Sequence, residues 1–214
     1  MKKRVLLLSD SLALPRREPE ETLYEDTYPF LLKTDFEVFQ FSKGGGLISE
    51  FVEQTFYYKQ YSPDYVILQC GIVDCAPRAF TRTEELYFQS NRMRRGLRRI
   101  ISKTVTTKRI RNLRRKSWTP AKDFRQACLS LMANLDGIPV YALSILPASP
   151  EYELQVPGIT AKIKEYNQIL SEVFGNRLID LNAIPLSDIM SDHHHLNKNG
   201  HLFVRNRILE SLDV

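Results

Sequence analysis

The sequence predicts an α/β fold in which a parallel sheet is covered by helices on both faces. Short apolar runs alternate along the chain with longer segments of helical periodicity, as in repeated strand–helix–strand units. The first apolar run is uninterrupted, which is typical of a strand buried on both faces. With 214 residues, the chain has the usual length of one domain with a substantial core. We therefore expect a single domain, residues 1–214, with a basic insertion at about residues 92–118.

Five strands are expected, in the following order along the chain. The run "RVLLLSD" at 4–10 is apolar until polar residues end it. The run "DFEVFQF" at 35–41 alternates apolar and polar side chains and stops at "SKGGG". The runs "DYVILQCG" at 64–71 and "GIPVYALSIL" at 137–146 predict two more strands, and "RLIDLN" at 177–182 is a weaker fifth.

Helices are expected between and after these strands, where apolar residues recur at helical spacing. Right-handed crossovers through them make the sheet parallel. The expected helices are residues 23–33, 47–58, 84–103, 121–134, 160–174 and 198–212. Two further stretches, 105–119 and 147–158, are expected to be irregular.

Positive charge is concentrated in one segment rather than spread over the chain. Between Arg92 and Lys116 lie twelve basic residues and no acidic one, whereas the net charge of the whole chain is only +5. The remainder carries 18 basic and 25 acidic side chains, a net charge of −7. The basic character therefore belongs to this segment and not to the molecule as a whole.

Several interpretations of the basic segment stay open. It is a solvated helix face, or a surface for an anionic membrane, for an acidic glycan, or for the phosphates of coenzyme A or a nucleotide sugar. Nucleic acid is disfavoured as a partner, because only Trp118 adds an aromatic side chain for base stacking. The candidate polyanion contacts are Arg94, Arg95, Arg98 and Arg99.

We expect a cytoplasmic protein, either free or peripheral to the inner face of the membrane. The start, "MKKRVLLLSDS", has a basic tip but an apolar run too short for a signal peptide. No run approaches the roughly 20 apolar residues of a membrane span. The three cysteines, Cys70, Cys75 and Cys128, are an odd number without framework spacing, which predicts free thiols in a reducing compartment.

Polar loops follow three of the expected strands. The first strand ends at "SDSL", the second at "KGGG" and the third at "GIVDCAPR". In a parallel sheet of this kind, ligands bind at the carboxyl ends of the strands, near the switch in strand order. The convergence of these loops therefore predicts a functional site at that edge.

Ser11, in the first of these loops, is either a helix N-cap or a nucleophile. Far along the chain, Asp192 and His195 are three residues apart, which places both side chains on one face of a helical turn. An aspartate beside an imidazole fixes its tautomer and stabilises the imidazolium, and a serine in reach of the other ring nitrogen is activated. The combination favours catalysis by Ser11.

All four histidines lie in "SDHHHLNKNGH", residues 191–201, which also suits a metal site. The sequence has no second cluster of ligands and no Cys-x-x-Cys pair, so we expect no native metal. By spacing, His195 is the catalytic candidate. His193 and His194 are expected near the mouth of the site, and His201 on a helix face.

Together these residues resemble the SGNH, or GDSL-type, hydrolase family, over nearly the whole chain and in block order. The stretch "SDSL" is similar to the first block, with Ser9 where glycine is usual and Ser11 at the nucleophile. The stretch "SKGGG" is similar to the second block, whose glycine offers a backbone N–H to the oxyanion. The alignment favours Gly46 for this role, with Gly45 as the alternative. The stretch "DHHHLN" matches the final Asp-x-x-His block, and "YNQIL" resembles a Tyr-Asn pair in the preceding helix.

The third block departs from the family at Val73. The stretch "GIVD" is similar to Gly-x-Asn-Asp, in which the asparagine donates a hydrogen bond to the developing oxyanion, and valine cannot donate. Removing one such donor costs roughly 10²–10³ in rate. Either another donor substitutes, or the enzyme is slow, or activity has been lost. Arg78, in the same loop, is a candidate substitute, and its alternative role is a solvated loop charge.

The resemblance implies a flavodoxin-like three-layer sandwich with a five-stranded parallel sheet and no cofactor. It implies a serine esterase or deacetylase that acts on an acylated small molecule or glycan. In that reading Ser11, His195 and Asp192 form the triad, and the N–H groups of Ser11 and Gly46 hold the oxyanion. The alternatives are an O-acyltransferase in polysaccharide biosynthesis and a catalytically degenerate member that only binds a polyanion or a membrane surface.

Overall fold

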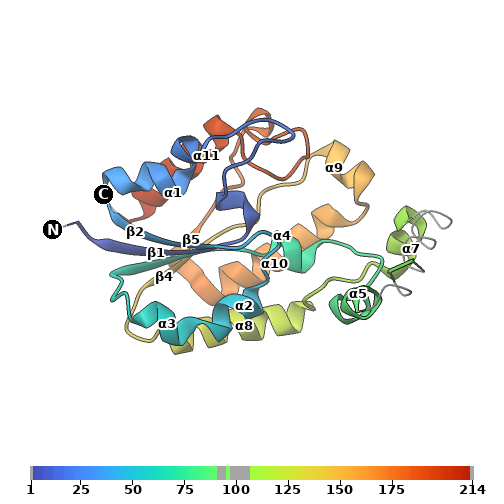
Figure 1. Cartoon of the computed structure of the whole chain (residues 1–214), viewed down its shortest axis with the longest axis horizontal. Coiled ribbons are helices and arrows are strands. Elements are labelled where there is room, and N and C mark those ends of the chain that lie inside the picture. The colour runs from blue at the N-terminus through green and yellow to red at the C-terminus, as the bar shows by residue number, and fades with distance from the viewer. Residues whose placement is uncertain (1, 91–94, 97–106, 213–214) are drawn as a thin grey trace.

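The centre of the computed structural model, which describes residues 2–90, 95–96 and 107–212, is a five-stranded sheet. Its strand order is β2-β1-β3-β4-β5, and every neighbouring pair is parallel (Figure 1). Helices cover both faces, so the predicted three-layer α/β sandwich is confirmed. Of the arginines predicted to contact a polyanion, Arg95 is exposed, whereas Arg94, Arg98 and Arg99 lie outside the described residues.

The strands are shorter than most of the apolar runs that predict them. They are β1 (Arg4–Ser9), β2 (Glu37–Ser42), β3 (Tyr65–Gln69), β4 (Val140–Leu143) and β5 (Leu178–Ile179). The side chains from Val5 to Leu8 are fully buried, because β1 lies between β2 and β3 and is covered on both faces. This burial explains the uninterrupted apolar run at the start of the chain.

The helices form the two outer layers and the rim at the carboxyl ends of the strands (Figure 1). On one face, α1 (Tyr28–Leu31) packs against α11 (Lys198–Ser211). The other face is covered by α2 (Ile48–Glu53), α3 (Thr55–Lys59), α8 (Ala121–Asn134) and α10 (Ile159–Phe174). The rim contains α4 (Ile72–Cys75), α5 (Arg82–Gln89), α7 (Thr107–Arg114) and α9 (Pro150–Gln155).

Two of the expected helices are broken into shorter pieces. The segment 23–33 has extended backbone at Leu23 and Thr27, and Pro29, which has no N–H to continue a helix, lies in the first turn of α1. The segment 47–58 divides between α2 and α3. There the Thr55 hydroxyl donates to the carbonyl of Val52 at 2.9 Å, a side-chain bond that bends helices.

Two stretches that were expected to be irregular each contain a helix. In 147–158, α9 starts at Ser149, whose hydroxyl accepts the Tyr152 N–H at 3.1 Å, and Pro150 occupies the first turn. In 105–119, α7 is held by tertiary contacts, since Arg114 pairs with Glu84 of α5 at 2.8 Å. The first helix has a local start signal, whereas the second depends on a partner distant in sequence.

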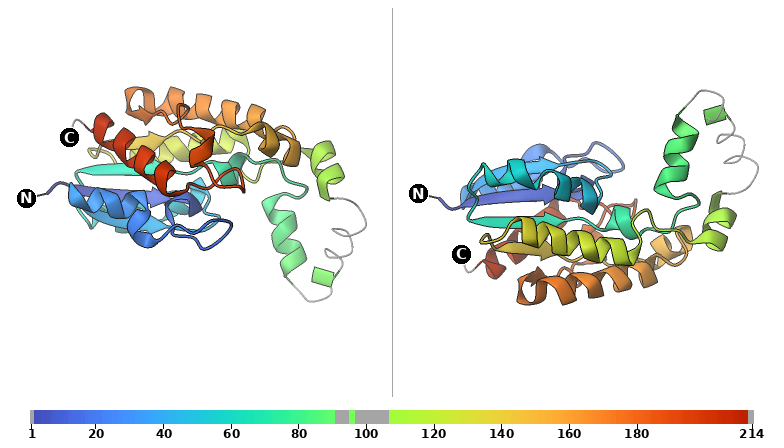
Figure 2. Two further views of the ribbon diagram at one scale, coloured as in Figure 1. Left: turned by 90° about the horizontal axis from the view of Figure 1, so that it is seen from above. Right: turned by 90° about the horizontal axis from the view of Figure 1, so that it is seen from below.

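The part of the chain between Arg78 and Lys116 is called the excursion. Its helices α5 and α7 project from the carboxyl edge of the sheet (Figure 2). The Arg78 N–H donates to the Lys116 carbonyl at 2.7 Å in an isolated antiparallel bridge, which brings the two ends of the excursion together. The excursion therefore begins before the predicted insertion at 92–118. Within the described part of the chain, no helix has the length and apolarity needed to cross a membrane.

His201 lies on the buried face of α11 and has a structural role. Its Nδ1 accepts the backbone N–H of Tyr28 at 3.2 Å, which joins α11 to α1. Burial lowers the pKa of His201 to about 4, so the ring is neutral and able to accept this bond at neutral pH. The three cysteines are free and buried, as their number predicts.

Candidate active site

Ser11 is placed by the turn that follows β1. The Asp10 N–H donates to the carbonyl of Gln69 on β3 at 3.0 Å, and the Asp10 carboxylate accepts the Leu12 N–H at 3.0 Å. These bonds hold the backbone on both sides of Ser11 while its hydroxyl stays partly exposed. Since β1 and β3 are adjacent in the strand order, Ser11 lies at the switch point where ligands bind in such sheets.

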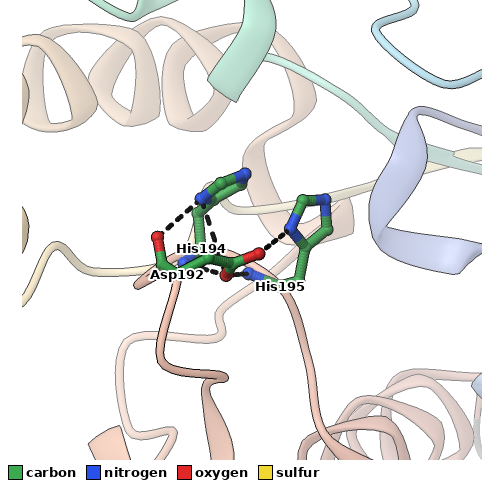
Figure 3. Close-up of side chains that lie close together, drawn as sticks. All are labelled: Asp192, His194 and His195. Atoms are coloured by element: carbon green, nitrogen blue, oxygen red, sulfur yellow. Dashed lines mark hydrogen bonds and ion pairs between the residues drawn. The ribbon is translucent and has the colours of Figure 1, made fainter. Parts of the chain in front are cut away.

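The loop before α11 carries the partners of Ser11. The Ser11 Oγ lies 3.0 Å from His195 Nε2, and His195 Nδ1 lies 2.6 Å from Asp192 Oδ2. The other carboxylate oxygen of Asp192 accepts the backbone N–H of His195 at 3.0 Å. The carboxylate lies beside both imidazole rings, with one oxygen toward His194 Nδ1 and the other toward His195 Nδ1 (Figure 3). The structure thus brings together the three residues that the sequence nominates for catalysis.

The protonation of this array follows from its contacts. Burial raises the pKa of Asp192, but the hydrogen bonds from the His195 side chain and backbone outweigh burial and hold the pKa below its ordinary value. Asp192 is therefore a carboxylate at neutral pH. The guanidinium of Arg16 also contacts His195 Nε2. Because arginine is always a donor, Nε2 must be the acceptor there, which places the ring proton on Nδ1, facing Asp192.

Arg16 is a site residue that the sequence did not indicate. It reaches the site from the loop after β1, where Arg16 and Thr22 exchange backbone hydrogen bonds of 2.9 and 2.8 Å. Further along this loop, Glu20 accepts the N–H of Ser191 at 3.1 Å, beside Asp192. The loop between Arg16 and Thr22 therefore packs against the loop that carries the histidines.

A cavity of about 310 Å³ opens beside Ser11. The core of the fold contributes Ser11, Val73 and His194 to its lining, whereas the excursion contributes Phe80, Glu85 and Arg111. Both Arg78 and Trp118, which flank the bridge that brings the ends of the excursion together, also line the cavity. One wall of the site is therefore made by the excursion, and Arg111 in this wall belongs to the segment that the sequence marks only as basic.

Val73 lies in the wall of this cavity, on the short helix α4. Gly71 precedes it with φ of 121°, and a Cβ at Gly71 would lie 2.7 Å from Ile145 Cδ1, so only glycine fits. Asp74 follows and accepts the Ile48 N–H at 3.3 Å and the Thr119 hydroxyl at 2.5 Å. These contacts fix α4, and they leave an apolar side chain where the resemblance predicts an amide donor.

Arg78 lines the same cavity, and its guanidinium lies over the ring of Trp118, 4.2 Å from the centroid. Its Nε is buried without a hydrogen-bond partner, and burial lowers the pKa of the guanidinium. It is thus a partly buried cation rather than a solvated loop charge. Stacking on Trp118 fixes the plane of the guanidinium.

The two candidate oxyanion glycines differ in their hydrogen bonding. The Gly46 N–H donates to the Lys43 carbonyl at 2.9 Å and closes a turn, in which Gly45 has φ of 69°. Among the described residues, no acceptor is found for the N–H of Gly45. Of the two, Gly45 is therefore the one whose N–H has no acceptor among the described residues.

Asp192, His194 and His195 could also hold a metal ion, since one ligand atom of each lies within 4.8 Å of the others. Three protein ligands and a water make an ordinary catalytic zinc site. A metal there would use side chains that now bond to Ser11 and to one another, so it would compete with the Ser11–His195–Asp192 array.

The Tyr-Asn pair of α10, Tyr166 and Asn167, hydrogen-bonds to backbone close to the site. The side chain of Asn167 accepts the N–H of Ile145 at 2.7 Å and donates to its carbonyl at 2.9 Å. The Tyr166 hydroxyl donates to the carbonyl of Thr119, whose side chain bonds to Asp74. The pair thus satisfies irregular backbone around β4 and α4.

No protein-family model and no curated protein sequence matches the chain. Solved structures resemble it over nearly its whole length. For the lipase/acylhydrolase from Enterococcus faecalis the TM-score is 0.66 at 14% identity, over 98% of this chain and 95% of that one. For Axe2, an acetylxylan esterase from Geobacillus stearothermophilus, it is 0.63 at 10% identity, over 99% and 94%. For a member of the lipolytic protein G-D-S-L family from Veillonella parvula it is 0.62 at 10% identity, over 97% of both chains. The chain therefore has the fold of the SGNH, or GDSL-type, hydrolases.

Proposed function

We propose that the chain is a serine esterase of the SGNH family that removes small acyl groups, acetyl above all, from a carbohydrate. The observation that carries the proposal is the hydrogen-bonded array of Ser11, His195 and Asp192. The fold supports it, because proteins that share the fold include an acetylxylan esterase and a lipase/acylhydrolase.

In the first half of the reaction, the Ser11 Oγ attacks the acyl carbonyl and its proton passes to His195 Nε2. Asp192 accepts the Nδ1–H of His195 and stabilises the imidazolium that forms. The contact between Arg16 and Nε2 must open at this step, since both groups are then cationic donors. His195 next gives its proton to the departing sugar oxygen, which leaves an acyl group on Ser11.

The tetrahedral oxyanion needs donors, and we assign the N–H groups of Ser11 and Gly45 to it. Gly45 takes the place of Gly46, whose N–H is engaged in a turn. In the second half of the reaction, water activated by His195 attacks the acyl group and releases the acid. A sugar hydroxyl in place of this water would make the protein an O-acyltransferase with the same residues.

Labelling with a fluorophosphonate probe tests the proposal, with 4-nitrophenyl acetate as the substrate. We expect the probe to modify Ser11. Ser11→Ala and His195→Ala should each lower kcat at least 10³-fold, and the double variant should be no slower, because the two residues act as a unit.

The control for these variants is Ser49→Ala, which removes an exposed serine outside the array and should keep both labelling and turnover. Wild-type turnover by Ser11→Ala would contradict the proposal. Turnover by Ser11→Ala together with loss in Asp192→Ala and stimulation by zinc would instead support the metal site.

A further inference from the structure

We infer that the cavity beside Ser11 binds a negatively charged group on the alcohol part of the substrate, a carboxylate or a phosphate, through Arg78 and Arg111. The inference rests on the proposed esterase function, since it takes Ser11 as the position of the scissile ester. It narrows the substrate class to acyl esters of acidic molecules, such as a sugar that carries a carboxylate or a phosphate.

Arg78 and Arg111 each have a guanidinium N–H group without a hydrogen-bond partner among the residues that the structure describes. Each lines the cavity, and the Nε of each is buried without a hydrogen-bond partner. A buried N–H without an acceptor costs free energy, more so on a charged group. The Nε and Nη atoms of a guanidinium form a fork that binds both oxygens of a carboxylate or phosphate. An anion that reaches these guanidinium groups would therefore satisfy donors that have no partner within the described part of the protein.

Both guanidinium groups are held in place before any ligand arrives. Arg78 is stacked on Trp118, and the Trp118 Nε1–H donates to the Phe80 carbonyl at 3.2 Å. Arg111 uses one Nη to donate to the carbonyl of Gln155, which anchors α7 beside α9. Side chains fixed in this way lose little further entropy when an anion binds.

The charge balance of the cavity also favours an anion. Among the described lining residues the one carboxylate belongs to Glu85, against the two cations of Arg78 and Arg111. Burial lowers the pKa of Arg78 most, and the charge of Arg111 lowers it further whereas that of Glu85 raises it, so Arg78 interacts with both groups. Repulsion between two cations in a partly buried site is relieved by a second anion, which the ligand supplies.

The size of the cavity points to the alcohol side of the ester. A volume of about 310 Å³ lies at the lower end of small-molecule sites, which suits one ring-sized unit. An acetyl group carries no charge and fills only a small part of this volume. The anionic group must therefore belong to the part of the substrate that leaves after Ser11 is acylated.

The test compares esters that differ in charge, measured at one pH and low salt. 4-Acetoxybenzoate is the carboxylate probe, its methyl ester is the neutral reference, and 4-acetoxyphenyl phosphate is the phosphate probe. For the wild type we expect kcat/KM at least tenfold higher for a charged probe than for the methyl ester. The ranking of the two charged probes tells whether a carboxylate or a phosphate is preferred.

Variants of Arg111 test whether this residue causes the preference for charged esters. Arg111→Gln should reduce the ratio of kcat/KM for a charged probe to kcat/KM for the methyl ester to about one, through a higher KM for the charged probes. Arg111→Lys should keep part of this preference. The control Arg115→Gln removes an exposed arginine just after the same helix and should keep the full preference. Thermal unfolding of each variant checks folding. Equal kcat/KM of the wild type for charged and neutral esters would overturn the inference without any variant.

A binding measurement separates this inference from the proposed function. If the wild type hydrolyses none of the three esters, the esterase proposal fails, and calorimetry then tests the cavity alone. We expect 4-acetoxybenzoate or 4-acetoxyphenyl phosphate to bind the wild type, the methyl ester not to bind, and Arg111→Gln to bind at least tenfold more weakly. Failure of both anions to bind the wild type would sink the anion site.

Discussion

Val73 is the residue at which this site differs most from the pattern it resembles. Its side chain is buried and lines the cavity beside Ser11, but it has no N–H or O–H group to donate a hydrogen bond. The alternative donor, Arg78, is stacked on Trp118, and we propose that it binds a substrate anion instead. In the proposed mechanism the oxyanion therefore relies on backbone N–H groups, and the enzyme is expected to be slow.

Replacing this valine should raise the rate. We expect Val73→Asn to increase kcat for 4-nitrophenyl acetate about tenfold with little change in KM, because the new bond forms to the transition-state oxygen. The ceiling is about 3–4 kcal/mol, the loss observed on deleting such a donor. Val73→Ala, which adds no donor, is the control. An unchanged rate in Val73→Asn with a collapse of kcat in Arg78→Ala would show that Arg78 already acts as the donor.

Some site residues could be predicted from the sequence because their chemistry limits them to a few types in a local pattern. Asp192 and His195 lie three apart, and the histidines of the chain are confined to one stretch. Arg16 could not be found in this way. It meets His195 across 179 residues of sequence, and an arginine is not distinctive in a chain with 30 lysines and arginines.

At the scale of elements, α11 and the loop before it keep the histidines in position. Asn197 caps α11, since its side chain accepts the N–H groups of Asn199 and Gly200 at 3.0 and 3.1 Å. Its own N–H donates to the Asp188 carbonyl at 3.1 Å. The close approach of that carbonyl to α11 is possible because position 200 has no side chain.

Gly200→Ala should therefore destabilise the protein, although alanine favours helices over glycine. The added Cβ would lie 2.3 Å from the Asp188 carbonyl oxygen, and backbone cannot move aside as a side-chain tip can. We expect a loss of about 1–3 kcal/mol in the free energy of unfolding, measured by urea denaturation, and a lower kcat. Gly44→Ala, where a Cβ meets nothing within 4 Å, is the control. Stability equal to the wild type would show that the loop before α11 adapts.

A separate prediction concerns the basic segment, which we expect to bind polyanions or membranes and to take no part in catalysis. Reversal of four arginines to glutamate should abolish salt-sensitive binding to anionic vesicles or to heparin, while hydrolysis of a neutral ester survives. Sedimentation with vesicles of anionic lipid and retention on heparin at increasing salt measure the two cases. The four are Arg94, Arg95, Arg98 and Arg99.

The control for this reversal is a pair of exposed lysines elsewhere, Lys59→Glu and Lys164→Glu, which should leave binding intact. Screening is weakest at low salt. Absence of binding by the native protein under that condition would refute the association.

A helix or strand could be predicted from the sequence when residues close to one another in the chain determine it. The helix at 121–134 was predicted to the residue, since it starts after Pro120 and shows an apolar face throughout. The helix α7 depends on a tertiary contact with Glu84, which periodicity does not report, and the break at 23–33 follows from Pro29, which periodicity does not weigh. The fold class was predictable because alternation of strands and helices is a property of the entire chain.

At the scale of the whole molecule, buried carboxyl groups tie stability to pH. Burial raises the pKa of Asp10 to about 7 and that of Asp74 to about 6, and each carboxyl has an oxygen without a hydrogen-bond partner. In the unfolded chain both groups ionise near 3.8. Their contribution to stability is therefore complete below pH 3.8 and is lost as the pH rises through 6 and 7, because ionised carboxylates must then stay buried.

Asp10→Asn should isolate this effect. The amide keeps an oxygen for the Leu12 N–H but cannot ionise, so the variant should gain stability relative to the wild type between pH 4 and pH 8. The ceiling is about 4 kcal/mol, from about three pKa units at 1.36 kcal/mol each. Urea denaturation at the two pH values measures it, with the exposed Asp136→Asn as the control. A stability difference that is the same at both pH values would contradict the assignment.

The bridge between Arg78 and Lys116 has a consequence for how such a protein can diversify. Because the two ends of the excursion are hydrogen-bonded to each other, everything between them can be lengthened, shortened or exchanged without moving a strand. The proposed nucleophile, Ser11, and its partners lie on loops of the sheet, whereas Phe80, Glu85 and Arg111 belong to the excursion. If the proposed function holds, evolution can thus exchange the residues that recognise the substrate as one module and keep the catalytic residues unchanged.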